Sequence, residues 1–232
     1  DQKLRGLGQP LWSAIGTVDS ILNQLYDQFQ FDTIHSHQET GPAFTYERDR
    51  IVRRWCQIKG VTWVEHRQHG IIRGLANRTN WDSQWADLMD APSLPEPDQL
   101  VGIGPPSNPV STLLDGMKWP HVIEEPTQLG GSESGYALLK SFLAKRCEGY
   151  RSGMSTPLAA EHSCSRLSAH FSLGTVSVRD AWQSCQEYRE MYKITKNKTR
   201  YVQSLKSFGS RLHWHCHFMQ KLESEPRIEI EE

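Results

Sequence analysis

The chain has 232 residues, enough for one large domain or two smaller ones and for a buried core that needs no disulfide bonds. Its 26 basic and 27 acidic residues give a net charge of −1, so contact with nucleic acid requires a local basic face. No apolar run approaches the roughly 20 residues of a membrane-spanning helix, which excludes an integral membrane protein. The five cysteines are odd in number and form no CxxC pair. They predict reduced thiols in a cytoplasmic protein, or in a nuclear or organellar one in a eukaryote.

The first part of the chain alternates between predicted helices and predicted strands. Apolar residues at three- and four-residue steps predict a helix over residues 11–29, and residues 31–37 alternate as a strand does. A second helix follows Gly41-Pro42 and ends at Lys59-Gly60, and residues 61–65 form another short strand. This order indicates parallel βαβ units, so residues 1–90 are expected to form an α/β domain with a partial, open, Rossmann-like sheet.

The second part of the chain is predicted to be all-helical. Residues 91–131 hold eight of the twelve prolines and are expected to be a long interdomain linker, and residues 132–232 are expected to form a helical domain. Ser177 and Asp180 resemble a capping box that opens one helix, and Gly209 is expected to weaken the last helix. The apolar face of this last helix is predicted to contain Val202, Leu205, Leu212, Phe218, Met219 and Leu222.

A run of hydroxyl-bearing residues, 163–168, precedes a predicted helix. Hydroxyls at a helix start suit a bound phosphate, because the first N–H groups and the helix dipole already favour an anion. Ordinary N-capping needs only one of these hydroxyls and is the alternative explanation.

Three histidines and a cysteine crowd one turn of the last helix. His213, Cys216 and His217 share a face at i, i+3 and i+4, while His215 lies between them. A structural zinc site needs a fourth ligand that no second cluster offers, so no metal is expected. A polar cleft in which the histidines transfer protons is the alternative.

Two further polar segments suggest ligand contacts. His35, Ser36, His37 and Glu39 follow a predicted parallel strand, where α/β sheets bind ligands, although a surface loop is an equal alternative. A run with no acidic residue between Met191 and Phe208 carries Lys193, Lys196, Lys198, Arg200 and Lys206, with tyrosines interleaved. Such a run is typical of a phosphate-backbone contact or, equally, of a solvated loop.

Taken in order, these segments resemble the photolyase and cryptochrome family of flavoproteins. Residues 36–41 followed by Tyr46-Glu47-Arg48-Asp49 resemble the family's acid-then-RD signature. Residues 164–179, from Cys164-Ser165-Arg166-Leu167-Ser168 to Val176-Ser177 and Arg179, resemble its TSxLSxxLxxGxxSxR motif. Residues 210–215 lie where the family carries a Glu-Leu-x-Trp-Arg run, and the resemblance covers nearly the whole chain as an internal fragment of a family member.

The resemblance implies a helical domain that binds FAD, and a second antenna chromophore of folate or deazaflavin type is left open. The cofactor-binding positions that it implies are Tyr150, Cys164, Ser165, Leu167, Ser168, Phe208 and Arg211. Trp214 matches a tryptophan that faces a flipped base, and His213, His215 and His217 are the other candidate catalytic residues. The implied partner is UV-damaged DNA, contacted by Trp214 and by Lys193, Lys196, Lys198 and Arg200, and the protein is expected to be a monomer.

Two positions depart from the family pattern. Arg211 stands where a Glu commonly hydrogen-bonds the damaged pyrimidines, and His215 stands where an Arg is common. A reversed charge cannot accept the same hydrogen bonds, which favours a photoproduct other than the cyclobutane dimer. A light-driven DNA photolyase is the first interpretation of the sequence. A cryptochrome that signals through a partner protein is the second, and a metal- or nucleic-acid-binding module without flavin is the third.

Overall fold

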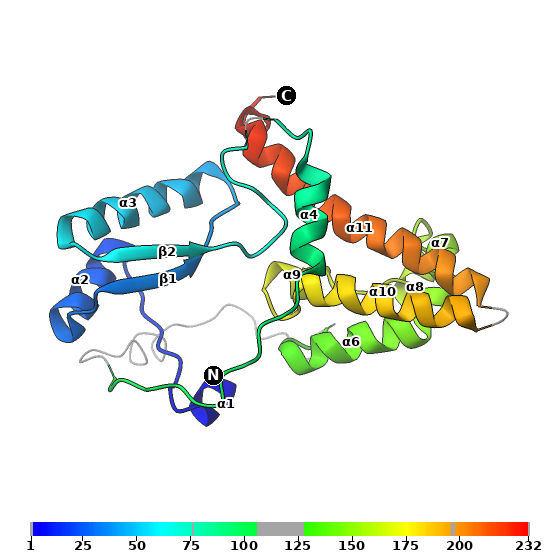
Figure 1. Ribbon diagram of the computed structural model, residues 1–232, viewed down its shortest axis with the longest axis horizontal. Coiled ribbons are helices and arrows are strands. Elements are labelled where there is room, and N and C mark those ends of the chain that lie inside the picture. The colour runs from blue at the N-terminus through cyan, green and yellow to red at the C-terminus, as the bar shows by residue number, and fades with distance from the viewer. Residues whose placement is uncertain (1, 76, 106–127, 196–197, 232) are drawn as a thin grey trace. The chain divides into compact units, whose positions relative to one another are not determined.

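The computed structural model describes residues 2–75, 77–105, 128–195 and 198–231 (Figure 1). The described residues form two compact units. One contains the residues up to His66 and those from Ser93 to Pro105. The other contains Arg67–Pro92 and the residues from Gln128 onward. The middle of the expected linker lies outside the described residues.

The first unit is built on two parallel strands. Its elements are α1 (Gln2–Gly6), α2 (Val18–Phe29), β1 (Thr33–His37), α3 (Ala43–Lys59) and β2 (Thr62–His66). The two strands pair in parallel from Thr33 opposite Thr62 to His37 opposite His66. This pairing around α3 is the predicted βαβ unit and confirms the α/β part of the fold.

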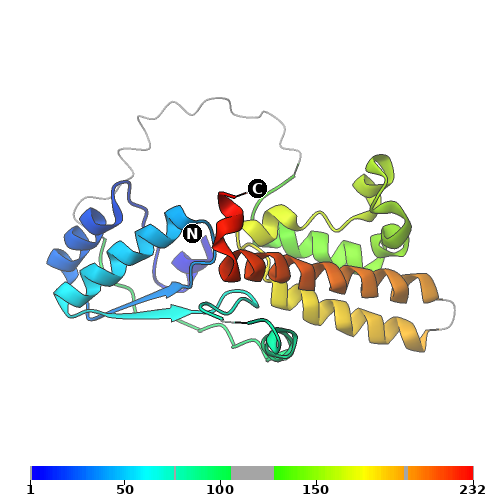
Figure 2. The same cartoon turned by 90° about the horizontal axis from the view of Figure 1, so that it is seen from above.

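Helices α2 and α3 cover the same face of the sheet, as Figure 2 shows. Val52, Trp55 and Cys56 of α3 are buried there, and the indole N–H of Trp55 donates to Asn23 Oδ1 of α2 at 3.0 Å. Helix α3 ends at Gly60, whose φ of 70° is costly for other residues and whose N–H donates to Cys56 O. The predicted C-terminus of this helix is therefore confirmed.

The regular secondary structure of the second unit, within its described residues, is all helical. It contains α4 (Trp81–Asp90), α6 (Ser132–Ala144), η1 (Arg146–Gly149), α7 (Tyr150–Gly153), α8 (Pro157–Ser163), α9 (Ser168–Ser172), α10 (Val178–Ile194), α11 (Thr199–Ser224) and η2 (Pro226–Glu229). Helices α10 and α11 lie side by side in both views (Figures 1 and 2). Ser177 caps α10 by accepting hydrogen bonds from the N–H groups of Arg179 and Asp180, as its position predicts.

Gly209 lets α10 and α11 approach closely. A Cβ at this position would lie 3.1 Å from Cζ3 of Trp182, and Ala181 and Cys185 beside it are fully buried. Gly209 was predicted to weaken the helix, but it has a packing role. The close contact with Trp182 offsets the low helix propensity of glycine.

The compact units do not follow the boundary expected near residue 90. Residues 67–92 pack with the helices, because Trp81, Trp85 and Met89 of α4 are buried in the helical core. Gln220 of α11 holds the segment before α4 by accepting from Ile72 N at 2.7 Å and donating to Ile72 O at 3.1 Å. The sequence pattern contains no trace of these contacts between distant segments.

Two details of the sequence prediction are wrong. The helix expected from residue 11 begins at Val18, since Thr17 occupies its N-cap position. Phe218 is 60% exposed rather than inward, because Leu212, Cys216 and Gln220 set the buried side of α11. None of the described helices has the length and hydropathy needed to span a bilayer.

Candidate functional site

Helix α11 carries all four candidate catalytic residues, His213, Trp214, His215 and His217. Its C-terminal half borders a cavity of about 600 Å³, here named the tryptophan cavity. The cavity is lined by Arg78, Trp81, Asp82, His213, Trp214, His217, Phe218 and Lys221. Aromatic walls with basic groups at the same opening suit a flat ligand that also carries negative charge.

His213 is held in place at one wall of the tryptophan cavity. Its Nε2 lies 2.9 Å from Oδ1 of Asp82, and its ring centroid lies 5.0 Å from that of Trp81 and 4.8 Å from that of Trp85. A carboxylate bonded to one ring nitrogen fixes the orientation of an imidazole and leaves its other ring nitrogen available to a ligand. His213 is therefore suited to giving or taking a proton within the cavity.

Trp214 forms an accessible aromatic surface on the same helix. The side chain is 46% exposed, and the guanidinium carbon of Arg211 lies 4.5 Å from the centre of its ring. Phe218 packs edge-on against it with centroids 6.1 Å apart. An exposed, edge-supported indole is a surface on which a base can stack.

His215 does not join the other two histidines. It lies outside the residues that line the tryptophan cavity, with its nearest aromatic partners at His69, 5.6 Å away, and Phe171, 6.1 Å away. Burial lowers the pKa of His215, which favours its neutral form. The structure thus brings His213, His217 and Trp214 together and separates His215 from them.

The histidine turn does not form a metal centre. No group of three or more His, Cys, Asp or Glu residues in the described part of the chain is arranged to hold a metal ion. Cys216 is fully buried, and burial raises the pKa of its thiol. The thiolate that a metal would require is therefore disfavoured.

Three of the expected flavin-contact residues form a buried wall. Tyr150 and Phe208 pack edge-to-face with centroids 5.9 Å apart, and both contact the ring of Phe142. Leu167 is fully buried in the same core cluster. Burial raises the pKa of the Tyr150 hydroxyl, so this group stays neutral.

The hydroxyl run is followed by a helix, as the sequence predicts, but that helix, α9, has only five residues. Ser163 ends α8 and donates to Ala159 O at 2.7 Å, and Leu167, whose side chain cannot cap, holds the N-cap position of α9. The guanidinium of Arg146 donates to the carbonyl oxygens of Cys164 and Ser165. A phosphate bound at this run would therefore lack the N-terminus of a helix of normal length.

The residues present fit a flavin nucleotide in part. Ser168 and Arg211 are exposed and Ser165 is half-buried, so their polar groups are accessible to a ligand, although the Arg211 guanidinium also lies over the Trp214 ring. Cys164 is half-buried, and burial raises the pKa of its thiol. Tyr150, Leu167 and Phe208 are buried and apolar, the kind of side chain that packs on the edge of a ring system.

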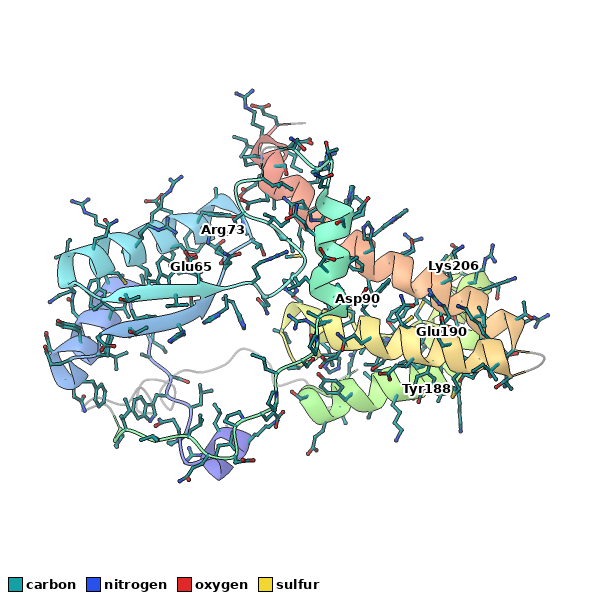
Figure 3. All side chains as sticks on the ribbon, viewed as in Figure 1. Glu65, Arg73, Asp90, Tyr188, Glu190 and Lys206 are labelled. Carbon is teal, nitrogen blue, oxygen red and sulfur yellow. The ribbon has the colours of Figure 1, made fainter. Side chains whose placement is uncertain are left out.

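Some cations of the basic run, residues 193–206, already contact other side chains of the protein. The ammonium of Lys193 lies 2.6 Å from Glu190, and that of Lys198 lies 4.3 Å from the ring centre of Tyr201. Figure 3 labels Lys206 and Glu190 on the α11 and α10 ribbons; Lys206 is exposed. Lys196 lies outside the described residues.

Arg200 instead borders a second and larger cavity of about 920 Å³, here named the basic cavity. Its lining consists of Lys145, Arg146, Glu148, Gly149, Arg151, Ser152, His162, Ser163, Arg200, Gln203 and Ser204. This cavity could not be predicted from the sequence, because its cations come from η1, α7, α11 and the junction between α6 and η1, and they form no single run along the chain.

The polar residues after β1 serve the turn that follows the strand. Glu39 accepts hydrogen bonds from the N–H groups of Thr40, at 2.9 Å, and Gly41, at 2.6 Å, and pairs with Arg48 at 2.8 Å. Burial opposes ionisation of this carboxyl, but the two N–H groups and the Arg48 charge outweigh it and lower its pKa. Nδ1 of His35 meets Nε2 of His66 at 3.0 Å. His35, Ser36 and His37 thus lie within β1 itself, and Glu39 belongs to the surface loop that follows the strand.

Comparisons with known proteins find likeness in solved structures. No family model matches the chain, and no curated protein sequence matches it. A cryptochrome of Synechocystis sp. PCC6803 matches 96% of the chain at 16% identity with a TM-score of 0.71. A bacterial class III photolyase from Agrobacterium tumefaciens matches 99% at 17% identity with a TM-score of 0.73. An archaeal photolyase from Sulfolobus tokodaii, solved with two FAD molecules, matches 98% at 22% identity with a TM-score of 0.62.

The matches cover between 46% and 48% of those three proteins, so the chain spans about half of their length. They include both photolyases and a cryptochrome, as the resemblance in the sequence implies. The α/β unit, the helical unit and their order along the chain all agree with this likeness. The chain therefore has the photolyase and cryptochrome fold over about half the length of those proteins.

Proposed function

We propose that the protein to which this chain belongs is a FAD-dependent, blue-light-driven DNA photolyase that repairs a UV pyrimidine photoproduct. The observation that carries the proposal is the tryptophan cavity, where the exposed Trp214 stands beside a histidine oriented by a carboxylate. FAD, when bound, would supply light absorption and the transfer of one electron to the lesion. The solved structures of the same fold include photolyases, which supports the proposal without deciding it.

The residues of this chain would bind and orient the lesion. A base turned out of the duplex would stack on Trp214, and Lys221 at the same cavity would attract a flanking phosphate, whereas Arg78 is already paired with Glu225 at 2.9 Å. His213, oriented by Asp82, would give a proton to the lesion and take it back. His215 is left out of this role, because it lies away from the cavity.

The alternative function is a cryptochrome photoreceptor without repair activity. Arg211 favours it, because its guanidinium is engaged with the Trp214 ring and a cation cannot accept the hydrogen bonds of damaged pyrimidines. In that case flavin would be retained, and the exposed face of α11 would meet a signalling protein.

The two functions are separated by a repair assay on the full-length protein. Flavin-loaded, reduced protein is illuminated with blue light on DNA that carries either cyclobutane dimers or 6-4 photoproducts, with a dark control. We expect light-dependent loss of one lesion, and we expect His213→Asn to slow it by a factor of about 10². His37→Asn, an exposed histidine of β1, is the matched control and should repair normally. Flavin-loaded protein that repairs neither lesion would move the assignment to the photoreceptor.

A further inference from the structure

The basic cavity holds more positive than negative charge. Its lining contains four Lys and Arg residues and one carboxylate, that of Glu148, which hydrogen-bonds Tyr201. Within the described residues, no ion pair or hydrogen bond engages the charged groups of Lys145 and Arg200, and both side chains are exposed. These two cations are available to an anion from solution.

Other residues of the cavity hold its walls in place. The backbone N–H of Arg151 donates to Ser204 Oγ at 3.3 Å, and that hydroxyl donates to Glu148 O at 3.3 Å. Arg151 also donates to Gln203 Oε1 at 3.1 Å. Because Ser204 is almost fully buried, these bonds fix η1 and α7 against the first turns of α11.

The composition of the lining identifies the kind of anion. Among the described residues His162 supplies the ring in the lining of the basic cavity and no Phe, Tyr or Trp does, so the cavity lacks the broad aromatic surface on which a flavin ring stacks. It offers instead guanidinium, ammonium and hydroxyl groups, the donors that contact phosphate oxygens in protein–DNA interfaces. This composition favours a phosphodiester backbone over a nucleotide whose ring would need an aromatic partner.

The cavity also lies in line with the tryptophan cavity. Arg200 and Trp214 are on the same helix, about 21 Å apart along its axis and within about 40° of each other around it. This distance corresponds to roughly six base pairs of duplex DNA. A single duplex can therefore contact both positions along one side of α11.

We propose that the basic cavity, through Lys145, Arg151 and Arg200, binds the phosphate backbone of nucleic acid independently of its sequence. This proposal rests on the proposed function for the identity of its partner, but it concerns binding of undamaged DNA in the dark. A protein that repairs no lesion but binds through these residues would refute only the photolyase assignment. If the protein repairs lesions but substitution of these residues does not change DNA binding, only the proposed binding role of the basic cavity is refuted.

The test measures the salt dependence of binding. The 232-residue chain is titrated into a fluorescein-labelled 20-base-pair duplex without lesions, and the dissociation constant is measured by anisotropy between 50 and 200 mM KCl. Lys145→Gln and Arg200→Gln should each reduce the slope of log K against log salt by about 1, with a roughly five- to tenfold loss of affinity at 100 mM. Lys140→Gln, an exposed lysine of α6 outside every cavity described, is the matched control and should keep the wild-type slope.

Two outcomes would overturn the proposal. The first is that Lys145→Gln and Arg200→Gln both show the same slope of log K against log salt as the control Lys140→Gln. The second comes from a parallel titration with inorganic pyrophosphate. If pyrophosphate binding depends on Lys145 and Arg200 while duplex binding does not, the cavity takes a free phosphate compound and not nucleic acid.

Discussion

At the scale of single residues, one turn of α11 gives three histidines three different environments. His213 meets a carboxylate, His217 packs against Trp81 with centroids 5.7 Å apart, and His215 lies half-buried between the rings of His69 and Phe171. The sequence places the three residues within five positions and identifies them as candidates for proton transfer. It cannot separate them, because their partners Asp82, Trp81 and His69 come from a segment more than a hundred residues earlier.

Burial of His215 makes the stability of the helical unit depend on pH. Its pKa is lowered in the folded protein, so the unfolded chain binds the proton more tightly. The stability it contributes is complete above its unfolded pKa of about 6.5 and is lost as the pH falls from there through the folded pKa. Each unit by which the pKa is lowered corresponds to about 1.4 kcal/mol. The unfolding free energy of the wild type should fall between pH 7.5 and pH 5. We therefore expect it to fall less in His215→Leu, as measured by urea denaturation at both pH values.

The control for this measurement is His37→Leu, since His37 is exposed on β1. It should leave the pH dependence as it is in the wild type. Equal pH dependence in the wild type and His215→Leu would show that protonation of His215 is not coupled to unfolding.

At the scale of elements, local signals in the sequence predict helix ends well and contacts between helices poorly. Ser177 at the start of α10 and Gly60 at the end of α3 act through their own backbone neighbourhood, so both were predictable. The role of Gly209 was not, because it depends on Trp182 of the neighbouring helix. The basic cavity was not predictable for the same reason, because its cations come together only when η1, α7 and α11 pack against one another.

The close contact at Gly209 predicts an unusual substitution effect. Alanine normally stabilises a helix interior by up to about 1 kcal/mol relative to glycine. Here the new methyl group would press on Trp182, which cannot move freely because its N–H is bonded to Asp90 Oδ1 at 2.8 Å and its ring packs on Trp85. We expect Gly209→Ala to lower the unfolding free energy by about 1 kcal/mol and the melting temperature by a few degrees.

Ser210→Ala, at the next and exposed position of α11, should change the melting temperature by less than one degree or raise it slightly. A Gly209→Ala variant more stable than the wild type would mean that Trp182 yields and that helix propensity dominates.

At the scale of the whole molecule, the helical unit presents apolar side chains at its surface. Leu158, Leu173, Trp214 and Phe218 are between 46% and 84% exposed. The chain spans about half the length of the solved proteins that share its fold. The sequence predicted this fold from the order of its motifs, and the resemblance implied a flavin pocket whose contacts in this chain come from one side only. Tyr150, Leu167 and Phe208 are the buried members of that set, and Tyr150 and Phe208 pack against each other with ring centroids 5.9 Å apart.

A pocket with one wall leaves most of a bound ligand exposed to water, whereas tight ligand sites bury 70–90% of the ligand surface. We therefore expect the 232-residue chain to hold well under 0.1 equivalents of FAD after purification, measured from the ratio of absorbance at 450 and 280 nm. The full-length protein is the positive control and should retain close to one equivalent. If the 232-residue chain retains stoichiometric flavin, its described residues enclose the cofactor by themselves, and Arg211→Ala would then show whether the exposed face of α11 takes part. If the full-length protein also lacks flavin after reconstitution, the fold is used without its cofactor, and the basic cavity becomes the main candidate for function.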